Sequence, residues 1–214
     1  MLDDISVDEA IYELRPDFAV LLITAEGLTN GPTDERSRAW LAEASAAPAQ
    51  PEKIEAWKEA YRAFGAKPQR TRPSVDALTR RLPLPEINQV VDAYNSISVK
   101  HALPIGGEDL DAYAGPARLV RATGDEHSEE ALGTPEPGEV IWRDDTGVTC
   151  RRWNWRQVVR TRLTEETTNA LFILERLEPM ELAELETAGK ELAELLSELS
   201  PEVRITTRLL SRGK

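Results

Sequence analysis

The side chains best suited to binding a ligand are those of residues 153–156 (Trp-Asn-Trp-Arg) and of the two arginines before them, Arg151 and Arg152. Aromatic rings stack nucleobases and guanidinium groups bind phosphates, so this combination is typical of sites for single-stranded RNA ends. If the run is a regular strand, one tryptophan lies in the core, and Asn154 and Arg156 share the opposite face. Arg156 could instead be a salt-bridge partner.

Other common catalytic and metal-binding patterns are missing from the sequence. Cys150 is the only cysteine and has no histidine near it, so a thiol nucleophile is not expected. With His101 and His127 as the only histidines, a Cys/His zinc site is not expected either. Glycine-rich nucleotide loops and the HExxH and GxSxG motifs are absent, and Asp109 and Asp111 fit turn stabilisation better than metal binding. We therefore expect neither a metal nor a cofactor.

Charge is distributed unevenly along the chain. Its 214 residues carry 26 Lys and Arg against 38 Asp and Glu, a formal net charge of −12, which by itself argues against nucleic acid. Residues 60–84, which include Arg70 and Arg72, and residues 150–163 are nevertheless basic. A basic face on an acidic body can steer nucleic acid toward a site. Alternatively, these arginines simply point outward from regular strands.

Hydrophobic spacing predicts the elements that position these side chains. Helices are expected over residues 33–44, 51–64, 74–81, 85–99 and 179–200. Strands are expected over residues 17–24, 117–122, 139–143, 148–153, 158–163, 170–177 and 203–210, with turns over 103–115. No internal repeat is present. We expect a single α+β domain over residues 1–214, with a mixed, antiparallel-rich sheet flanked by helices.

Two stretches in this order resemble a known family. The first stretch is residues 90–111 (VVDAYNSISVKHALPIGGEDLD). The second is residues 164–169 (TEETTN), which precede an apolar strand and Glu175. They resemble segments of the editing domain of the phenylalanyl-tRNA synthetase beta subunit, which is also called the B-three/B-four or tRNA-binding domain. That family shows a Val-Asp-x-x-Asn opening and a Gln-Pro-x-His-x-x-Asp-x-Asp loop. Val91, Asp92 and Asn95 match the opening, and Pro104, Asp109 and Asp111 match the loop. The resemblance covers roughly residues 10–178.

The resemblance implies a function. In the family, this domain hydrolyses the ester bond of a tRNA that carries the wrong amino acid. Because a synthetase catalytic core is missing from these residues, the resemblance implies an editing domain that acts in trans on aminoacyl-tRNA. An aminoacyl ester is already activated, so a pocket that orients the ester and a water needs no nucleophile. A non-catalytic tRNA- or RNA-binding module on the same face is the alternative.

The resemblance also implies roles for individual residues. Asn95 falls where the family has a pocket Asn, whose amide would orient a ribose hydroxyl or a substrate ammonium; the alternative is a helix cap. Gly106 falls where the family has a His, which leaves a roomier pocket without that candidate proton-transfer group. Glu175 is the candidate for the carboxylate that contacts the polar end of the amino acid, but Ile173 competes for that place and would make the pocket apolar. The expected catalytic residues are Asn95 and Glu175, the expected substrate-binding residues are Gly106, Trp153, Asn154, Arg156, Thr168 and Asn169, and the expected RNA-binding residues are Arg151, Arg152, Arg70 and Arg72.

Partners and location follow from the remaining patterns. No apolar run is long enough for a membrane span, and the acidic N-terminus does not fit a signal or transit peptide, so a cytoplasmic location without membrane contact is expected. Leucines form an apolar stripe in the acidic helix over residues 179–200, and its glutamates most simply form a solvated face. A protein partner bound through this helix is the alternative. The sequence makes no prediction of the oligomeric state.

Overall fold

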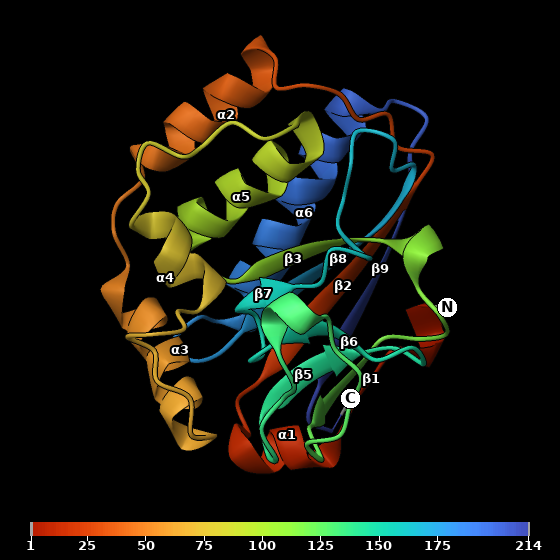
Figure 1. Ribbon diagram of the computed structural model, residues 1–214. Coiled ribbons are helices and arrows are strands. Elements are labelled where there is room, and N and C mark those ends of the chain that lie inside the picture. Colours follow the sequence, from red (N-terminus) through yellow and green to blue (C-terminus); the bar gives the residue numbers. More distant parts are fainter. Residues whose placement is uncertain (1, 214) are drawn as a thin grey trace.

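The computed structural model describes residues 2–213 and contains two β-sheets with helices packed around them (Figure 1). The sheet that we call the central sheet has the strand order β3-β8-β2-β9 and is antiparallel throughout. Its strands are β2 (Ala19–Glu26), β3 (Ile105–Asp109), β8 (Asn169–Arg176) and β9 (Arg204–Ser211). The nearly continuous apolar runs of β2 and β8 place these two strands in the middle, where both faces are covered.

The second sheet, which we call the small sheet, has the order β1-β4-β5-β6-β7. Its strands are β1 (Ser6–Val7), β4 (Arg118–Arg121), β5 (Val140–Arg143), β6 (Val148–Arg151) and β7 (Arg156–Gln157). Only the β1–β4 pair is parallel. The two sheets together confirm the predicted α+β class, although the strands divide between two sheets where one was expected.

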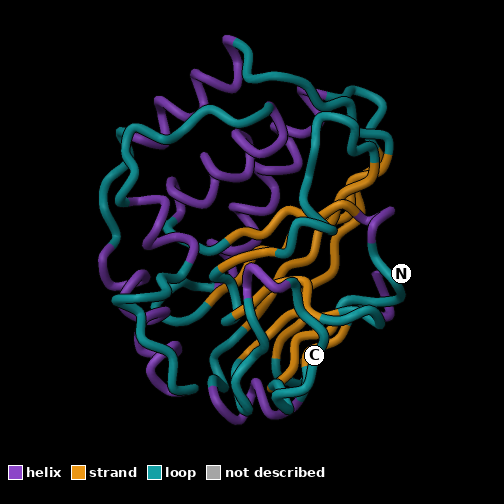
Figure 2. Tube along the Cα trace, viewed as in Figure 1, coloured by secondary structure: helices purple, strands orange, loops and turns teal. Residues whose placement is uncertain are grey.

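Each face of the central sheet packs against a different layer. In β2, Val20 and Leu22 belong to a core with the small sheet and α3, whereas Leu21 and Ile23 belong to a core with α5 and α6. The layers are therefore helices, central sheet, and small sheet with α3. Figure 2 shows most of the helices, in purple, above and to the left of the strands, in orange. The helices are α1 (Glu9–Leu14), α2 (Glu35–Ser45), α3 (Pro51–Ala63), α4 (Ser74–Thr79), α5 (Gln89–His101) and α6 (Leu182–Leu199), with short 3₁₀ turns at Leu2–Asp4, Leu110–Ala112 and Glu130–Leu132.

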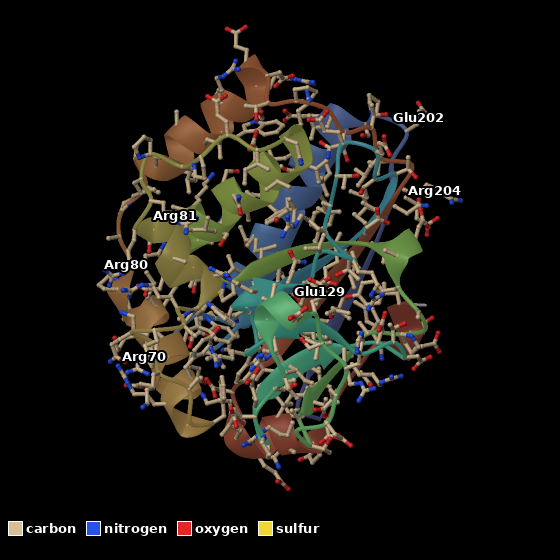
Figure 3. The ribbon with its side chains drawn as sticks, viewed as in Figure 1. Arg70, Arg80, Arg81, Glu129, Glu202 and Arg204 are labelled. Carbon is tan, nitrogen blue, oxygen red and sulfur yellow. The ribbon has the colours of Figure 1, made fainter. Side chains whose placement is uncertain are left out.

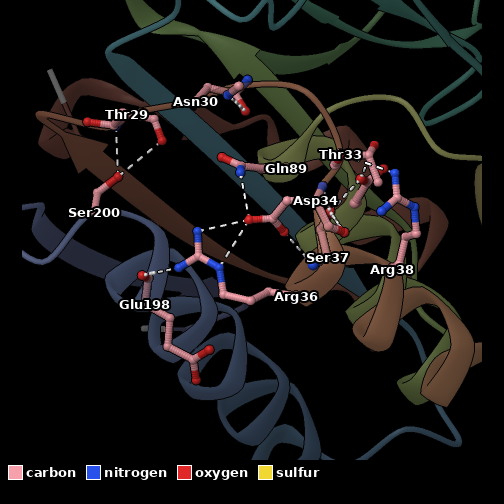
Figure 4. A network of polar contacts seen from close by, with 12 residues as sticks. Thr29, Asn30, Thr33, Asp34, Arg36, Ser37, Arg38, Gln89, Glu198 and Ser200 are labelled. Atoms are coloured by element: carbon pink, nitrogen blue, oxygen red, sulfur yellow. Dashed lines mark hydrogen bonds and ion pairs between the residues drawn. The ribbon is translucent and has the colours of Figure 1, made fainter.

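A polar network fixes the start of α5. The carboxyl of Asp34 accepts hydrogen bonds from the backbone N–H of Ser37 at 3.0 Å, which caps α2, and from Nε2 of Gln89 at 3.0 Å. Arg36 joins the same carboxyl and donates to the carbonyl oxygen of Glu198 at 3.0 Å, so three helices meet at this point (Figure 4). Asp92 of the matched motif is fully buried and accepts from Thr33, Ser37 and the backbone of Ile87, so its role is structural.

Helix α6 packs closely on the central sheet. Its leucines at 185, 192 and 196 are fully buried, and a Cβ at Gly189 would lie only 2.2 Å from Cδ2 of Leu21. The apolar stripe is therefore core, and exposed glutamates such as Glu186 and Glu194 form the outer face. A partner of this helix would have to bind the glutamate face. None of the helices within residues 2–213 combines the length and apolar character needed to cross a membrane.

Several predicted boundaries are wrong. Residues 105–109 form β3 where a turn was expected, because pairing with β8 overrides the low strand propensity of two glycines and two acids. Residues 158–163 form no strand, because Arg160 folds back onto Asp144 at 2.9 Å, and only a bridge between Glu108 and Arg162 remains. Helix α5 begins after Asn88, whose side chain accepts from Val91 N at 3.0 Å, rather than at residue 85.

Candidate functional site

A cavity of about 520 Å³ opens between α4, α5, the β6–β7 turn and one face of the central sheet. This size lies in the range of small-molecule sites. The cavity brings together most of the predicted site residues, because Asn95, Gly106, Trp153, Asn154, Arg156, Glu175, Arg70 and Arg72 all line it.

Glu175 is a buried carboxyl in this cavity, at the end of β8, and only 2 % of its surface is exposed. Nε1 of Trp142 donates to Oε1 at 2.8 Å, and Nδ2 of Asn154 donates to Oε2 at 2.8 Å. Burial raises the pKa of Glu175 to about 8, against the opposing effect of these donors and of the Trp153 indole nearby. The carboxyl therefore exchanges its proton near neutral pH, a property of groups that transfer protons in catalysis.

Ile173 and Glu175 lie two residues apart on β8, so both side chains point to the same face. Both line the cavity. The sequence left open whether Ile173 or Glu175 faces the cavity. Both do, so the cavity has an apolar and an acidic residue side by side. Gly106 pairs with Ile173 on the neighbouring strand, and a Cβ at Gly106 would meet nothing within 4 Å. The absent side chain enlarges the cavity directly in front of Ile173.

Asn95 lies in the middle of α5, so the alternative of a helix cap is wrong; α5 ends at Ala102 in the left-handed conformation. Asn95 is 6 % exposed and faces the cavity. Its side chain makes no hydrogen bond to any residue in the described part of the chain, 2–213. A buried amide without a protein partner is available to a ligand or to water.

The Trp153-Asn154 segment is a tight turn rather than a regular strand, because Arg152 and Trp153 adopt left-handed conformations with φ of 48° and 66°. Trp153 is fully buried and packs edge-on against Phe18 and Trp57, so it is a core residue and not a base-stacking surface. The expectation that Asn154 and Arg156 share a face fails, since Asn154 is buried against Glu175 and Arg156 is exposed.

Trp155 is the partly exposed tryptophan of this turn. Its ring is contacted by two guanidinium groups, that of Arg152 at 4.7 Å and that of Arg156 at 5.2 Å from the ring centre. These cation–π contacts hold both arginines beside the cavity. A base that stacks on Trp155 would have to displace one of them.

Four arginines line the outer part of the cavity: Arg70, Arg72, Arg81 and Arg156. Arg72 is paired with Asp76 at 3.2 Å. The other three are exposed and form no salt bridge with any residue between 2 and 213. Arg70 and Arg81 lie on one side of the molecule, and Arg204 lies on the opposite side (Figure 3). The mouth of the cavity is therefore basic in an otherwise acidic protein.

Three predicted site residues lie elsewhere. Arg151 is 2 % exposed and forms a buried ion pair with Glu139 at 2.5 Å, so it cannot reach RNA. Thr168 and Asn169 lie at the other end of β8 from Glu175, about 20 Å away at 3.3 Å per residue. Asn169 instead donates to Asp111 at 2.9 Å, which ties β8 to the end of β3.

The acidic residues of the matched loop are structural. Oδ2 of Asp109 accepts from Thr167 at 2.7 Å, and Asp111 accepts from Asn169. The two matched stretches therefore meet in space and close one end of the central sheet. Sequence reasoning missed Glu108, Trp142 and Arg81 in the cavity. Had residues 105–109 been recognised as a strand, the alternation of side chains would have placed Glu108 on the same face as Gly106.

The remaining reactive side chains are accounted for. Cys150 is buried, and burial raises the pKa of its thiol well above the ordinary value, which disfavours a nucleophile. His101 lies at the end of α5 and contacts Glu191 of α6 at 3.0 Å, away from the cavity. Within residues 2–213, no group of His, Cys, Asp and Glu side chains is arranged to hold a metal ion.

Comparison with known proteins identifies the family. The family model described as the B3/4 domain matches residues 56–201. No curated protein matches the chain. A solved structure that matches is the crystal structure of an N-terminal fragment of the phenylalanyl-tRNA synthetase beta-subunit from Pyrococcus horikoshii, with 15 % identity and a TM-score of 0.49 over 94 % of this chain. The match covers 49 % of that fragment, so the chain spans about half of its length. Since the family model covers well over half of the sequence, the chain belongs to the B3/4 domain family.

Proposed function

We propose that the cavity binds the aminoacylated end of a tRNA and hydrolyses the ester bond of a mischarged amino acid, in trans to the synthetase that formed it. One observation carries this proposal: a basic mouth leads to a buried carboxyl and a free amide, in a chain of the B3/4 domain family. Phosphates are expected at the mouth and the aminoacyl group inside.

The mouth supplies the contacts for RNA. Arg70, Arg81 and Arg156 have no carboxylate partner within residues 2–213, so binding a phosphate breaks no existing salt bridge. Guanidinium groups bind phosphate oxygens in pairs of hydrogen bonds. Arg152, which lies beside Trp155 and 3.7 Å from Glu139, adds a further positive charge.

The interior supplies the groups for ester hydrolysis. In the proposed reaction, a water adds to the ester carbonyl carbon while its proton passes to Glu175. The bond between that carbon and the ribose oxygen then breaks, and the ribose oxygen takes the proton from Glu175. Asn95 donates its amide N–H to the ester or to a ribose hydroxyl and holds the reacting atoms in place. Because burial raises the pKa of Glu175 to about 8, the ionised form that accepts the proton increases as the pH rises toward 8, and the rate should rise with it.

A deacylation assay with a panel of mischarged tRNAs tests the proposal. Glu175→Gln should lower the hydrolysis rate by about a hundredfold or more, as expected for loss of a general base, and Asn95→Ala should lower it as well. Thr168→Ala is the matched control, because Thr168 is exposed at the far end of β8, and it should leave the rate unchanged. Failure of the wild-type protein to hydrolyse any of the esters faster than buffer alone would refute the proposal.

A non-catalytic RNA-binding module is the second candidate, and Gly106 favours it. A glycine there provides no imidazole in the cavity, and the space before it is open. This function predicts tRNA binding that weakens steeply with salt and no turnover of any mischarged tRNA. The same panel, assayed for binding and for hydrolysis, separates the two candidates.

A further inference from the structure

Glu108 is a second buried carboxyl in the cavity, and the proposed reaction does not use it. It is 1 % exposed, and the hydroxyl of Tyr113 donates a hydrogen bond to its Oε2. Within residues 2–213 it has no salt-bridge partner, and burial raises its pKa against the opposing effect of the donor side chains of Tyr113, Gln157 and Thr161. A buried carboxyl without a basic partner costs stability compared with an apolar side chain. Its presence in the cavity therefore points to a ligand.

The register of the central sheet places the carboxyls of Glu108 and Glu175 on the same face of the sheet, which forms one wall of the cavity. Gly106 pairs with Ile173, and Glu108 pairs with Leu171. Paired residues and residues two apart share a face, so Gly106, Glu108 and Glu175 all point into the same side of the sheet. Gly106 lies between the two acids and leaves open space, since a Cβ there would meet no atom within 4 Å. Along this wall of the cavity, Glu175 and Glu108 are therefore separated by Gly106, which has no side chain.

We propose that Glu108 selects the amino acid: it binds the tip of an aminoacyl side chain that ends in a hydrogen-bond donor, either a hydroxyl or an amino group. This proposal rests on the proposed function, since it assumes that the aminoacyl group occupies the cavity. With the ester held near Glu175 and Asn95, the side chain passes over Gly106 and ends at Glu108. An apolar side chain would shut Glu108 off from water and leave it only its contacts within the protein, such as the hydrogen bond from Tyr113. A polar site discriminates strongly against such a ligand.

Three isosteric probes test this assignment. They are 3′-aminoacylamino-3′-deoxyadenosines, in which a stable amide replaces the ester, and they carry norleucyl, 5-hydroxynorvalyl or ornithyl groups. Their side chains have equal length and end in a methyl, a hydroxyl and an ammonium group. Calorimetry should show that the two donor probes bind the wild-type protein about tenfold more tightly, or better, than the norleucyl probe.

The variant Glu108→Gln should remove most of the donor advantage, and it should leave the affinity of the norleucyl probe nearly unchanged. Glu130→Gln, which changes an exposed carboxyl outside the cavity, is the control and should keep the donor advantage. Equal affinity of the three probes for the wild-type protein would overturn the role of Glu108 and leave the proposed function standing. Absence of binding by all three would overturn both. The wild-type comparison decides the matter even if Glu108→Gln does not fold.

Discussion

The side-chain amide of Asn154 donates a 2.8 Å hydrogen bond to Oε2 of Glu175, and its carbonyl oxygen accepts a 2.9 Å hydrogen bond from the hydroxyl of Tyr61. Trp142 donates to the other oxygen of the same carboxyl. One buried network therefore connects α3, the β6–β7 turn, β5 and β8. Because each member is buried, removing one leaves others without a partner, and both the stability and the acidity of the site depend on the network.

The first prediction concerns Asn154→Ala. Loss of the amide leaves the hydroxyl of Tyr61 and Oε2 of Glu175 each without a partner, so the free energy of unfolding should fall by about 1–3 kcal/mol or more. The pKa of Glu175 should rise further, because a donor that stabilises its charged form is lost. Urea unfolding and a carboxyl-carbon NMR titration measure the two effects. Asn169→Ala, at the far end of β8, should leave the pKa of Glu175 unchanged, and an unchanged pKa in Asn154→Ala would contradict the network.

The second prediction concerns pH and stability. Burial raises the pKa of Glu175 from 4.5 to about 8 in the folded protein, so between these values the folded state holds a proton that the unfolded state releases. This contribution to stability is fully present below about pH 4.5 and is lost as the pH rises through about 8, at up to about 1.4 kcal/mol per pH unit. Urea unfolding from pH 5 to pH 8 should show a steeper decline for the wild-type protein than for Glu175→Gln. Parallel curves of unfolding free energy against pH for the two proteins would contradict the prediction, because they would show that Glu175 is ionised in the folded protein.

Sequence patterns predicted the fold class because the central elements are strongly periodic. Residues 51–64 and 170–177 carry apolar side chains at helical and strand spacing, and both elements lie where they were expected. The strand β3 could not be predicted locally. Its residues, Ile-Gly-Gly-Glu-Asp, resemble a turn, and only pairing with β8 makes them a strand. The division into two sheets likewise depends on long-range pairing that no local pattern carries.

The candidate site was predicted where a residue type and a matched motif coincided. Asn95, Gly106 and Glu175 lie together in one cavity, and the roles that the resemblance implies for them stay predictions. The predictions for Thr168 and Arg151 failed for physical reasons: the first lies at the far end of its strand, and the second is buried against Glu139. The sequence alone does not show which basic residues form ion pairs with acidic residues that are distant in the chain.

The third prediction compares two adjacent glycines. A Cβ at Gly106 would enter open space, so Gly106→Ala should change the free energy of unfolding by less than about 1 kcal/mol. A Cβ at Gly107, on the other face of β3, would lie 2.7 Å from both Leu163 Cδ1 and Tyr94 Cε1. Gly107→Ala should therefore destabilise the protein by about 1–3 kcal/mol, as overpacked cores do. Urea unfolding of the two variants measures this difference, and equal losses would show that the cavity before Gly106 is closed.

The fourth prediction compares two adjacent arginines at the end of α4. Figure 3 labels both arginines on the same side of the molecule. Arg81 lines the cavity and has no salt bridge within residues 2–213, whereas Arg80 is paired with Asp76 at 3.1 Å and does not line the cavity. Removal of one phosphate contact should lower the slope of log K against log salt concentration by about 0.7–0.9. Fluorescence anisotropy with labelled tRNA, from low to moderate salt, should show this loss for Arg81→Ala.

Arg80→Ala is the matched control, because it removes the same charge from a neighbouring exposed position. It should leave the salt slope nearly unchanged if tRNA enters through the mouth of the cavity. Equal effects of the two substitutions would instead mean that tRNA responds to the general charge of this side of the protein. Since Arg70 and Arg156 share the exposure and the free charge of Arg81, each should reproduce its effect when replaced by alanine. The double variant Arg70→Ala/Arg81→Ala should lower the slope of log K against log salt concentration about twice as much as either single variant, because two phosphate contacts are lost.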